Sequence, residues 1–222
     1  MSELLEKIAT CVERGKINAT SPYPPDLKGQ EGADELTQKA VDEGIDPQRI
    51  LNEALMVGMQ RIGVKFRDNK VFVPDVLMAA KAMGTAMGHL KPHFLSGAVK
   101  RKGRFVIGTV AGDLHDIGKN LVSMMIEGGG WEIVDLGVDV SSEKFLQAIQ
   151  EYPGCVVGLS ALLTTTMANM EQTVGAIKEK HPDIRVLVGG APLTEEFAEK
   201  IGADRYCADP HGAVEYLDTL AA

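Results

Sequence analysis

Apolar residues recur at helical spacing from Ser2 to about Pro92. The four groups are Leu4, Leu5, Ile8 and Val12; Leu36, Ala40 and Val41; Ile50, Leu51, Ala54, Leu55, Met59 and Ile62; and Val76, Leu77, Ala80, Met83, Met87 and Leu90. This spacing puts each group on one face of an α-helix. Because the segments between the groups are short, the pattern predicts four helices in an antiparallel bundle.

Turn and cap residues separate the same segments. Three prolines between Ser21 and Pro25 predict a loop, and Gly44 follows the second helix. Asp46 and Pro47 are typical of a helix N-cap followed by the first helical position, and Pro74 can open the last helix.

Short β-branched runs alternate with helical stretches after the basic segment that ends at Gly103. The predicted strands are 105–110, 132–135, 156–159, 186–188 and 205–207, and the predicted helices are 117–127, 142–151, 167–180, 195–201 and 211–220. Continuous apolar strands separated by helices favour a parallel sheet covered on both faces. We therefore expect two domains. A four-helix bundle over residues 1–92 and a linker over 93–103 precede a doubly wound, five-stranded α/β domain of Rossmann or flavodoxin type over 104–222.

Composition and charge exclude some partners. With 222 residues, 45% hydrophobic and 24% charged, the chain is long enough for a buried core. Its net charge is −8, with most of the excess acid after His93, which argues against nucleic acid or an anionic membrane as a partner. Three distant cysteines predict neither a disulfide framework nor a zinc site and fit a reducing cytoplasm. The chain shows no apolar run of membrane-spanning length and no export signal.

The loops after the strands are the candidate ligand sites, because doubly wound sheets bind ligands beyond the carboxyl ends of their strands. The first loop does not match a phosphate loop, since five residues separate Gly112 from Gly118 and Asn120 replaces the Mg²⁺-binding hydroxyl. What remains is His115 with Asp113 two positions before it. A carboxylate on one ring nitrogen fixes the tautomer of a metal-ligating imidazole. Taken alone, a solvated or capping His115 is the alternative.

Two other loops add features of a different kind. The third strand is followed by three consecutive threonines, Thr164 to Thr166, and the fourth strand ends in Gly189-Gly190. A helix cap explains the threonines singly, and a turn explains the glycines singly. Together with His115, a hydroxyl row and a glycine floor fit a large flat cofactor with a polar tail.

Three motifs in order resemble those of cobalamin-binding domains. Asp113-Leu114-His115-Asp116-Ile117-Gly118 matches DxHxxG, Ser160-Ala161-Leu162 matches SxL, and Gly189-Gly190 matches the closing GG. The helical segment adds Gly58-Met59, Gly63, Phe66, Phe72-x-Pro74 and Ala79 to Met83, which resemble the cap module before the corrinoid domain in methyltransferase proteins. The resemblance covers nearly the whole chain. It extends to the corrinoid proteins of methanol, methylamine and O-demethylase systems and to the B12-binding cap and domain of methionine synthase.

This resemblance implies cobalamin or a related corrinoid bound base-off and His-on. His115 is then the lower axial cobalt ligand, Asp113 bonds its far ring nitrogen, and Thr166 extends the relay where methionine synthase has a serine. The other implied contacts are Leu114, Asp116, Ile117, Gly118, Ser160, Leu162, Thr164, Gly189 and Gly190, with Phe72, Val76 and Met83 from the cap over the upper face.

The resemblance also implies a non-catalytic carrier subunit. Such a subunit accepts a methyl group on Co(I) from a substrate-specific methyltransferase. It passes the group from methyl-Co(III) to a second methyltransferase that uses tetrahydrofolate or coenzyme M. A reductive activase is the third implied partner. The donor stays open among methanol, methylamines, quaternary amines and methoxylated aromatics, although Ser21 to Pro25 and Lys28 to Gly32 are similar to O-demethylase proteins.

Three other functions use related domains. A cobalamin-dependent sensor carries a basic DNA-binding module, and no basic segment of that size occurs in these residues. The small subunit of an adenosylcobalamin mutase shares DxHxxG but has no need of the helical cap. A receiver-like signalling domain requires a phosphoacceptor aspartate at the third strand end, where this chain has Ser160.

Overall fold

The computed structural model describes residues 3–95 and 100–221. The chain divides into two compact units, one comprising Met1–Arg101 with Gly128–Gly130 and the other Lys102–Glu127 with Trp131–Ala222. The division falls inside the predicted linker over 93–103, of which residues 96–99 lie outside the described residues.

The first unit is helical, as predicted. Its elements are α1 (Glu3–Glu13), the 3₁₀ turn η1 (Pro25–Leu27), α2 (Ala33–Asp42), α3 (Pro47–Ile50), the π-helical segment η2 (Leu51–Leu55), α4 (Met56–Arg67) and α5 (Val73–Leu95). The predicted third helix is thus α3, η2 and α4 in succession. It begins where expected, because the Asp46 side chain accepts a hydrogen bond from the Gln48 amide and Pro47 occupies the first helical position.

Helix α5 differs from the expectation at its end. The predicted bundle ends at residue 92, whereas α5 continues through Pro92 to Leu95. Proline lacks an N–H and removes one helical hydrogen bond. Here it stands three residues before the helix end, where that loss leaves the preceding turns intact.

The second unit confirms the predicted doubly wound α/β fold. Its strands are β1 (Arg104–Thr109), β2 (Glu132–Asp135), β3 (Val156–Ser160), β4 (Val186–Gly189) and β5 (Arg205–Tyr206). Its helices are α6 (Ile117–Gly128), α7 (Ser142–Glu151), the 3₁₀ turn η3 (Thr164–Thr166), α8 (Met167–Lys180), α9 (Glu195–Lys200) and α10 (Pro210–Leu220). All strand pairs are parallel, and in the described part of the chain the sheet has the order β2-β1-β3-β4-β5.

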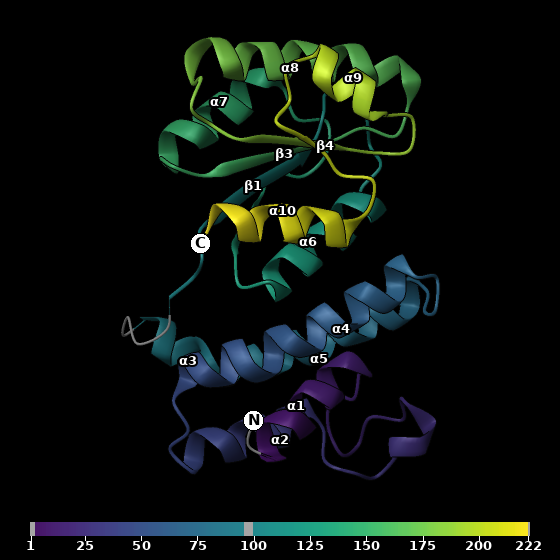
Figure 1. The fold of residues 1–222 in the computed structure, drawn as a ribbon, viewed down its shortest axis with the longest axis vertical. Coiled ribbons are helices and arrows are strands. Elements are labelled where there is room, and N and C mark those ends of the chain that lie inside the picture. Colours follow the sequence, from purple (N-terminus) through teal and green to yellow (C-terminus); the bar gives the residue numbers. More distant parts are fainter. Residues whose placement is uncertain (1–2, 96–99, 222) are drawn as a thin grey trace. The chain divides into compact units, whose positions relative to one another are not determined.

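Helices cover both faces of this sheet. Figure 1 shows α7, α8 and α9 on one face and α6 and α10 on the other. The first face packs around Phe145, Val157 and Met170, and the second around Phe105 and Trp131. Because both faces are buried, the central strands are continuously apolar, which is the pattern that the sequence displays.

The carboxyl ends of three strands lie level with one another. Thr109, the last residue of β1, pairs with Ser160, the last of β3, and Ser160 pairs with Gly189, the last of β4. The order of connections reverses between β1 and β3, so the loops after them diverge to opposite faces and leave a crevice typical of ligand sites. The sheet therefore brings the three motif-bearing loops to one edge.

No helix in the described part of the chain combines the length and apolar character that crossing a membrane requires.

Gly190 carries a tight contact between two of these loops. Its φ is +139°, and a Cβ at this position would overlap the carbonyl oxygen of Ala161. Gly190→Ala is therefore expected to lower the free energy of unfolding by about 3 kcal/mol, because backbone must move to admit the methyl group. Urea denaturation followed by the fluorescence of Trp131, the chain's single tryptophan, measures this unit directly.

Gly175→Ala is the matched control for this substitution. Gly175 lies within α8, and no described atom comes within 4 Å of a Cβ at that position. Its replacement should stabilise the unit by about 0.5–1 kcal/mol, since alanine favours the helix. Equal midpoints for the two variants would contradict the steric role of Gly190.

Candidate functional site

A buried carboxylate, that of Asp113, lies at the centre of the site. Its side chain has no exposed surface. Oδ1 accepts hydrogen bonds from the ring Nδ1 of His115 at 2.7 Å and from the His115 amide at 3.1 Å. Oδ2 accepts from the amides of Leu162 and Leu163 at 2.7 and 3.3 Å and from the Thr166 hydroxyl at 2.8 Å. Donors from the loops after β1 and β3 thus converge on one group.

These donors keep Asp113 ionised. Burial by itself raises the pKa of a carboxyl group, but the hydrogen bonds from Leu162, His115 and Thr166 outweigh it and hold the pKa of Asp113 well below its usual range. An ionised carboxylate only accepts hydrogen bonds, so the proton between Asp113 and His115 belongs to Nδ1 of the ring. The neutral imidazole therefore carries its lone pair on Nε2.

The imidazole of His115 is accessible while its backbone is held. Its side chain is 50% exposed, and its carbonyl oxygen accepts a hydrogen bond from the Thr109 hydroxyl at 2.9 Å. Leu114 and Ile117, which flank it in sequence, are 71% and 75% exposed. A half-exposed imidazole next in sequence to exposed apolar side chains is a surface suited to an apolar ring system that binds through a metal.

The three glycines of the motifs differ in what a side chain at each position would contact. A Cβ at Gly118, the second residue of α6, would meet no described atom within 4 Å. Gly118 is thus not required by the packing of the described protein, and the space beside it is open to a ligand. Gly190, by contrast, is required by the Ala161 carbonyl, and a Cβ on Gly189 would lie 3.2 Å from the Cys207 carbonyl oxygen. Gly189 and Gly190, which were expected to form the floor of a ligand site, therefore also allow the protein's own backbone to pack closely.

The remaining residues implied by the resemblance differ in how far their side chains are buried. Asp116, Leu162 and Thr164 are exposed and Ser160 is half-buried at the same edge. In the helical unit Phe72 is 71% exposed, whereas Val76 and Met83 are buried. A buried side chain cannot touch a ligand unless its neighbours move. The expected contacts of Phe72, Val76 and Met83 with the cofactor stay predictions.

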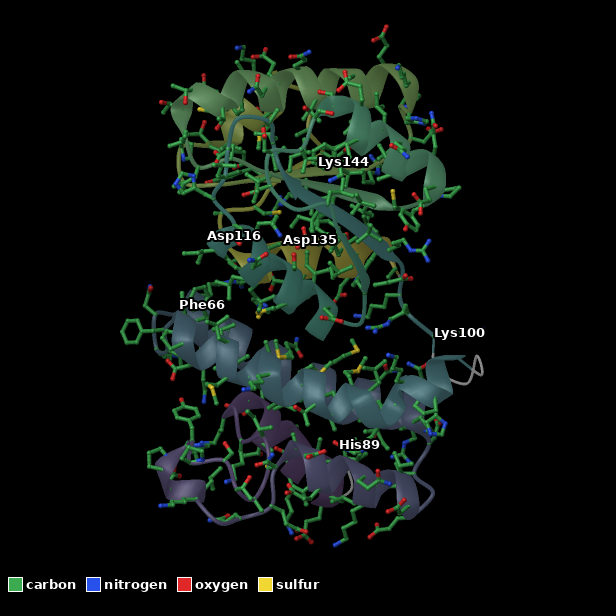
Figure 2. All side chains as sticks on the ribbon, turned by 180° about the vertical axis from the view of Figure 1, so that it is seen from behind. Phe66, His89, Lys100, Asp116, Asp135 and Lys144 are labelled. Atoms are coloured by element: carbon green, nitrogen blue, oxygen red, sulfur yellow. The ribbon has the colours of Figure 1, made fainter. Side chains whose placement is uncertain are left out.

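Lys119 and Asp135 support the site but were not predicted from the sequence. Lys119 is buried, and its Nζ donates to Oδ2 of Asp135 at 2.5 Å and to Oδ1 of Asn120 at 2.7 Å. This ion pair ties the first turn of α6 to the end of β2, and Figure 2 labels Asp135 and the neighbouring Asp116. Asp135 could have been found from its place at the carboxyl end of a strand, but Lys119 looks like a solvated helix residue.

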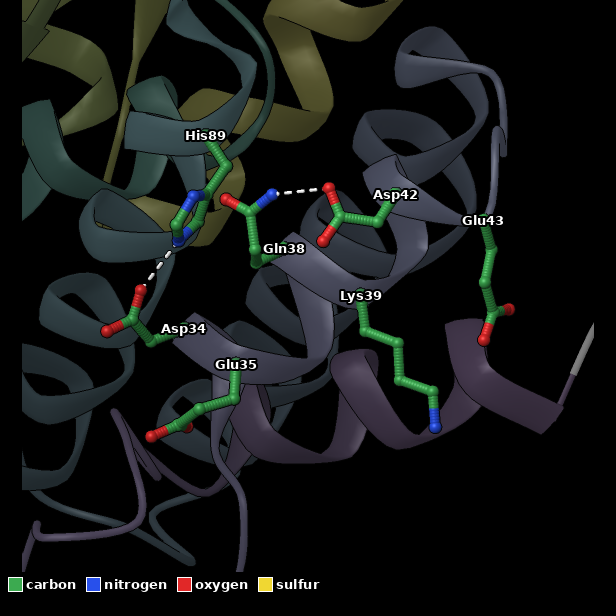
Figure 3. A pocket seen from close by; sticks show the side chains of 7 residues that line it. All are labelled: Asp34, Glu35, Gln38, Lys39, Asp42, Glu43 and His89. Carbon is green, nitrogen blue, oxygen red and sulfur yellow. Dashed lines mark hydrogen bonds and ion pairs between the residues drawn. The ribbon is translucent and has the colours of Figure 1, made fainter.

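A depression on the helical unit offers no comparable chemistry. It is lined by Asp34, Glu35, Gln38, Lys39, Asp42, Glu43 and His89 (Figure 3). His89 Nε2 lies 2.6 Å from Asp34 Oδ1, and Gln38 donates to Asp42 at 2.7 Å. Among the described residues, no three His, Cys, Asp or Glu side chains are grouped so that they could hold a metal ion.

The fold and this geometry define a class of protein: a cofactor-binding α/β domain with a histidine, oriented by a buried carboxylate, that can ligate a metal. Comparison with known proteins agrees. Two family models, each described as a B12 binding domain, match residues 103–215 and residues 30–91.

Curated relatives and a solved structure extend the match to the whole chain. A corrinoid protein of Desulfitobacterium hafniense is 39% identical, with 84% of this chain and 88% of that protein covered. Dimethylamine corrinoid protein 3 of Methanosarcina acetivorans is 41% identical, with 81% and 85% covered. The methanol:cobalamin methyltransferase complex of Methanosarcina barkeri contains a chain with a TM-score of 0.82 and 30% identity, with 99% of this chain and 80% of that chain covered.

The chain belongs to the B12-binding corrinoid proteins of methyltransferase systems, and its cofactor is cobalamin or a related corrinoid. The residues present fit that group in two respects. His115 offers a half-exposed imidazole whose Nδ1 is bonded to Asp113, and the open space beside Gly118 leaves room for a ligand next to α6.

Asp113→Asn tests the central carboxylate. An amide has only one oxygen, so its NH₂ group must face at least one of the five donors, and the variant should lose about 2–3 kcal/mol of unfolding free energy at pH 7. Because folding lowers the pKa of Asp113, its contribution is present above about pH 4, the unfolded value, and is lost as pH falls towards the folded value.

The difference between wild type and Asp113→Asn should therefore shrink below about pH 4. Trp131 fluorescence in urea between pH 7 and pH 3 measures it on the cofactor-free protein. Asp183→Asn, an exposed aspartate on the turn before β4, is the control. A constant difference across this range would show that Asp113 is not an ionised, hydrogen-bonded group.

Proposed function

We propose that this chain is a methyl carrier in which His115 binds the corrinoid cobalt from below through Nε2. The observation that carries this proposal is the contact between the Asp113 carboxylate and His115 Nδ1 at 2.7 Å. It leaves Nε2 as the lone-pair atom of a half-exposed ring. The lower base of the cofactor is then detached, in the base-off and His-on state.

The corrinoid cobalt supplies the methyl-accepting and methyl-donating chemistry when bound. The chain's own residues set how strongly His115 holds it. Asp113 fixes the tautomer and orientation of the ring by accepting from Nδ1, and the Thr166 hydroxyl donates to the other oxygen of Asp113. A proton taken up at Nε2 removes the ligand lone pair. The His115–Asp113–Thr166 series is therefore a relay through which axial binding is tuned.

The other loop residues hold the rest of the cofactor. The tail of the detached base would run past Ser160, Leu162 and Thr164 and past the glycines Gly118, Gly189 and Gly190. Leu114 and Ile117 offer exposed apolar surface close to His115 in sequence, and Asp116 follows His115 directly. Phe72, exposed on the helical unit, is the candidate for the upper, methyl-bearing face.

The role in methyl transfer rests on the relatives. Curated relatives are named dimethylamine and trimethylamine corrinoid proteins, and the solved relative belongs to a methanol:cobalamin methyltransferase complex. By this likeness the chain serves a substrate-specific methyltransferase as donor partner. A second methyltransferase, acting on coenzyme M or tetrahydrofolate, and a reductive activase complete the proposed cycle.

Histidine ligation can be observed directly. Wild-type protein labelled with ¹⁵N-histidine and reconstituted with cob(II)alamin should give an electron paramagnetic resonance spectrum with coupling to one protein nitrogen. His115→Ala should abolish this coupling, because Nε2 is the proposed ligand. Coupling to the nitrogen of dimethylbenzimidazole in the wild type would refute His-on binding.

His89→Ala is the matched control, since His89 also contacts a carboxylate, that of Asp34, but on the helical unit. It should keep the histidine coupling. The same three proteins test the carrier role, because a holoprotein incubated with a cognate donor methyltransferase should take up one methyl group per corrinoid. If no donor methyltransferase of the amine, methanol or methoxyl class loads the wild type, the carrier role is wrong.

Gly118→Ala should have opposite effects on stability and on binding. Alanine in the first turn of α6 should raise the unfolding free energy of the cofactor-free protein by about 0.5–1 kcal/mol, since no described atom obstructs its methyl group. The same methyl group should weaken corrinoid binding at least tenfold, because it fills space proposed for the cofactor. Urea denaturation and corrinoid titration measure the two quantities.

Gly175→Ala again serves as control, because its methyl group also meets open space but lies within α8. It should stabilise the protein and leave corrinoid affinity unchanged. Unaltered affinity in Gly118→Ala would show that the cofactor does not approach this part of α6.

A further inference from the structure

The turn that precedes His115 is held by side chains from two other segments. It comprises Ala111, Gly112 and Asp113, and Gly112 has a φ of +80°. Its own sequence supplies one hydrogen bond, from the Asp113 amide to the Val110 carbonyl at 3.1 Å. The Ala111 carbonyl, the Gly112 amide and the Asp113 carbonyl bond to residues outside the turn.

Asp139, in the loop between β2 and α7, makes a reciprocal pair of bonds with this turn. Its Oδ1 accepts from the Gly112 amide at 2.7 Å, and its own amide donates to the Asp113 carbonyl at 3.0 Å. Asp139 has a φ of +53°, a left-handed conformation that side chains rarely adopt and that Asp and Asn tolerate better than other residues. This backbone conformation lets the amide and the carboxylate of Asp139 both bond to the turn formed by residues 111–113.

Asn169, near the start of α8, holds the turn from the other side. Its Nδ2 donates to the Ala111 carbonyl at 2.7 Å. Three successive residues of the turn are therefore held by two residues, through the Asn169 side chain and through the side chain and amide of Asp139. These two residues follow β3 and β2, the strands that flank β1 in the sheet.

The loop that presents Asp139 is itself braced. Its Gly137 amide donates to Oδ1 of Asp135 at 2.9 Å, and Lys144 Nζ donates to the Leu136 carbonyl at 2.8 Å. Asp135 and Lys144 are both labelled in Figure 2. Val140, the next residue after Asp139, forms a parallel bridge with Val110 and donates to the Thr109 carbonyl. These bonds hold the loop that carries Asp139 in place, so Asp139 can position the turn.

We propose that Asp139, together with Asn169, is a positioning residue that orients Asp113 and through it the His115 imidazole before any cofactor binds. The reason is geometric. The Asp113 carboxylate must reach Leu162 and Thr166 with one oxygen and His115 with the other, so a shift of its backbone breaks one set of bonds. This inference rests on the proposed role of His115 as cobalt ligand and adds the residues that preorganise it.

The experiment separates the Asp139 carboxylate from its backbone conformation with three variants. Asp139→Asn keeps an oxygen acceptor and tolerates the left-handed φ, Asp139→Gly keeps only the backbone tolerance, and Asp139→Ala keeps neither. Asn169→Asp, an isosteric change, removes the donor to Ala111. The control is Asp183→Ala, an exposed aspartate before β4.

The first measurement uses the full chain without cofactor. Nuclear magnetic resonance follows the exchange with water of the Gly112 amide proton and of the His115 Nδ1 proton. Loss of one hydrogen bond of ordinary strength should speed this exchange about fivefold in Asp139→Gly, Asp139→Ala and Asn169→Asp. Asp139→Asn and Asp183→Ala should match the wild type.

The second measurement uses the same proteins loaded with cob(II)alamin and records the fraction of cobalt with a histidine nitrogen. That fraction should fall in the three impaired variants and be restored in Asp139→Asn. Normal behaviour of Asp139→Gly beside an impaired Asp139→Ala would assign the effect to backbone conformation and overturn the proposal. Unchanged exchange in both would overturn it as well.

A failure of the proposed function would give a different experimental result from a failure of this inference. A wild-type spectrum without a histidine nitrogen refutes His115 ligation, while the exchange of Gly112 and His115 protons in the cofactor-free chain still decides whether Asp139 orients the turn.

Discussion

The satisfaction of one buried charge, the carboxylate of Asp113, is the constraint on which the rest of the site depends. A carboxylate without exposed surface is tolerated only if hydrogen bonds replace its lost water, and donors from the loops after β1 and β3 do so. Both loops must then stay close together at the edge of the sheet. The same bonds fix the tautomer of His115, so the stability of the fold and the function of the site share one interaction.

The sheet makes this convergence possible. Parallel pairing places Thr109, Ser160 and Gly189 level with one another, and the reversal of connections between β1 and β3 opens the crevice above them. Gly190 then allows the loop after β4 to approach the Ala161 carbonyl. Each loop is short and tied to its neighbour, which suits the proposed role of His115 as a metal ligand held in one orientation.

One part of the site is buried and hydrogen-bonded, whereas the other part is exposed. Asp113, Thr166 and Lys119 are buried and bonded, whereas His115, Leu114 and Ile117 are exposed. Contiguous apolar surface on a protein marks places where a ligand or partner binds. We propose that the corrinoid covers the apolar surface that Leu114 and Ile117 leave exposed.

The sequence by itself determined the two-part organisation, the parallel sheet, the strand ends and the pairing of Asp113 with His115, because each depends on local periodicity or on residues two positions apart. Tertiary structure alone decided the partners of the Asp113 turn. Asp139 and Asn169 lie 27 and 58 residues from the groups they bind, and no local pattern relates them. It also buried Val76 and Met83 while leaving Phe72 exposed, because the face that a helix buries depends on which neighbours pack against it.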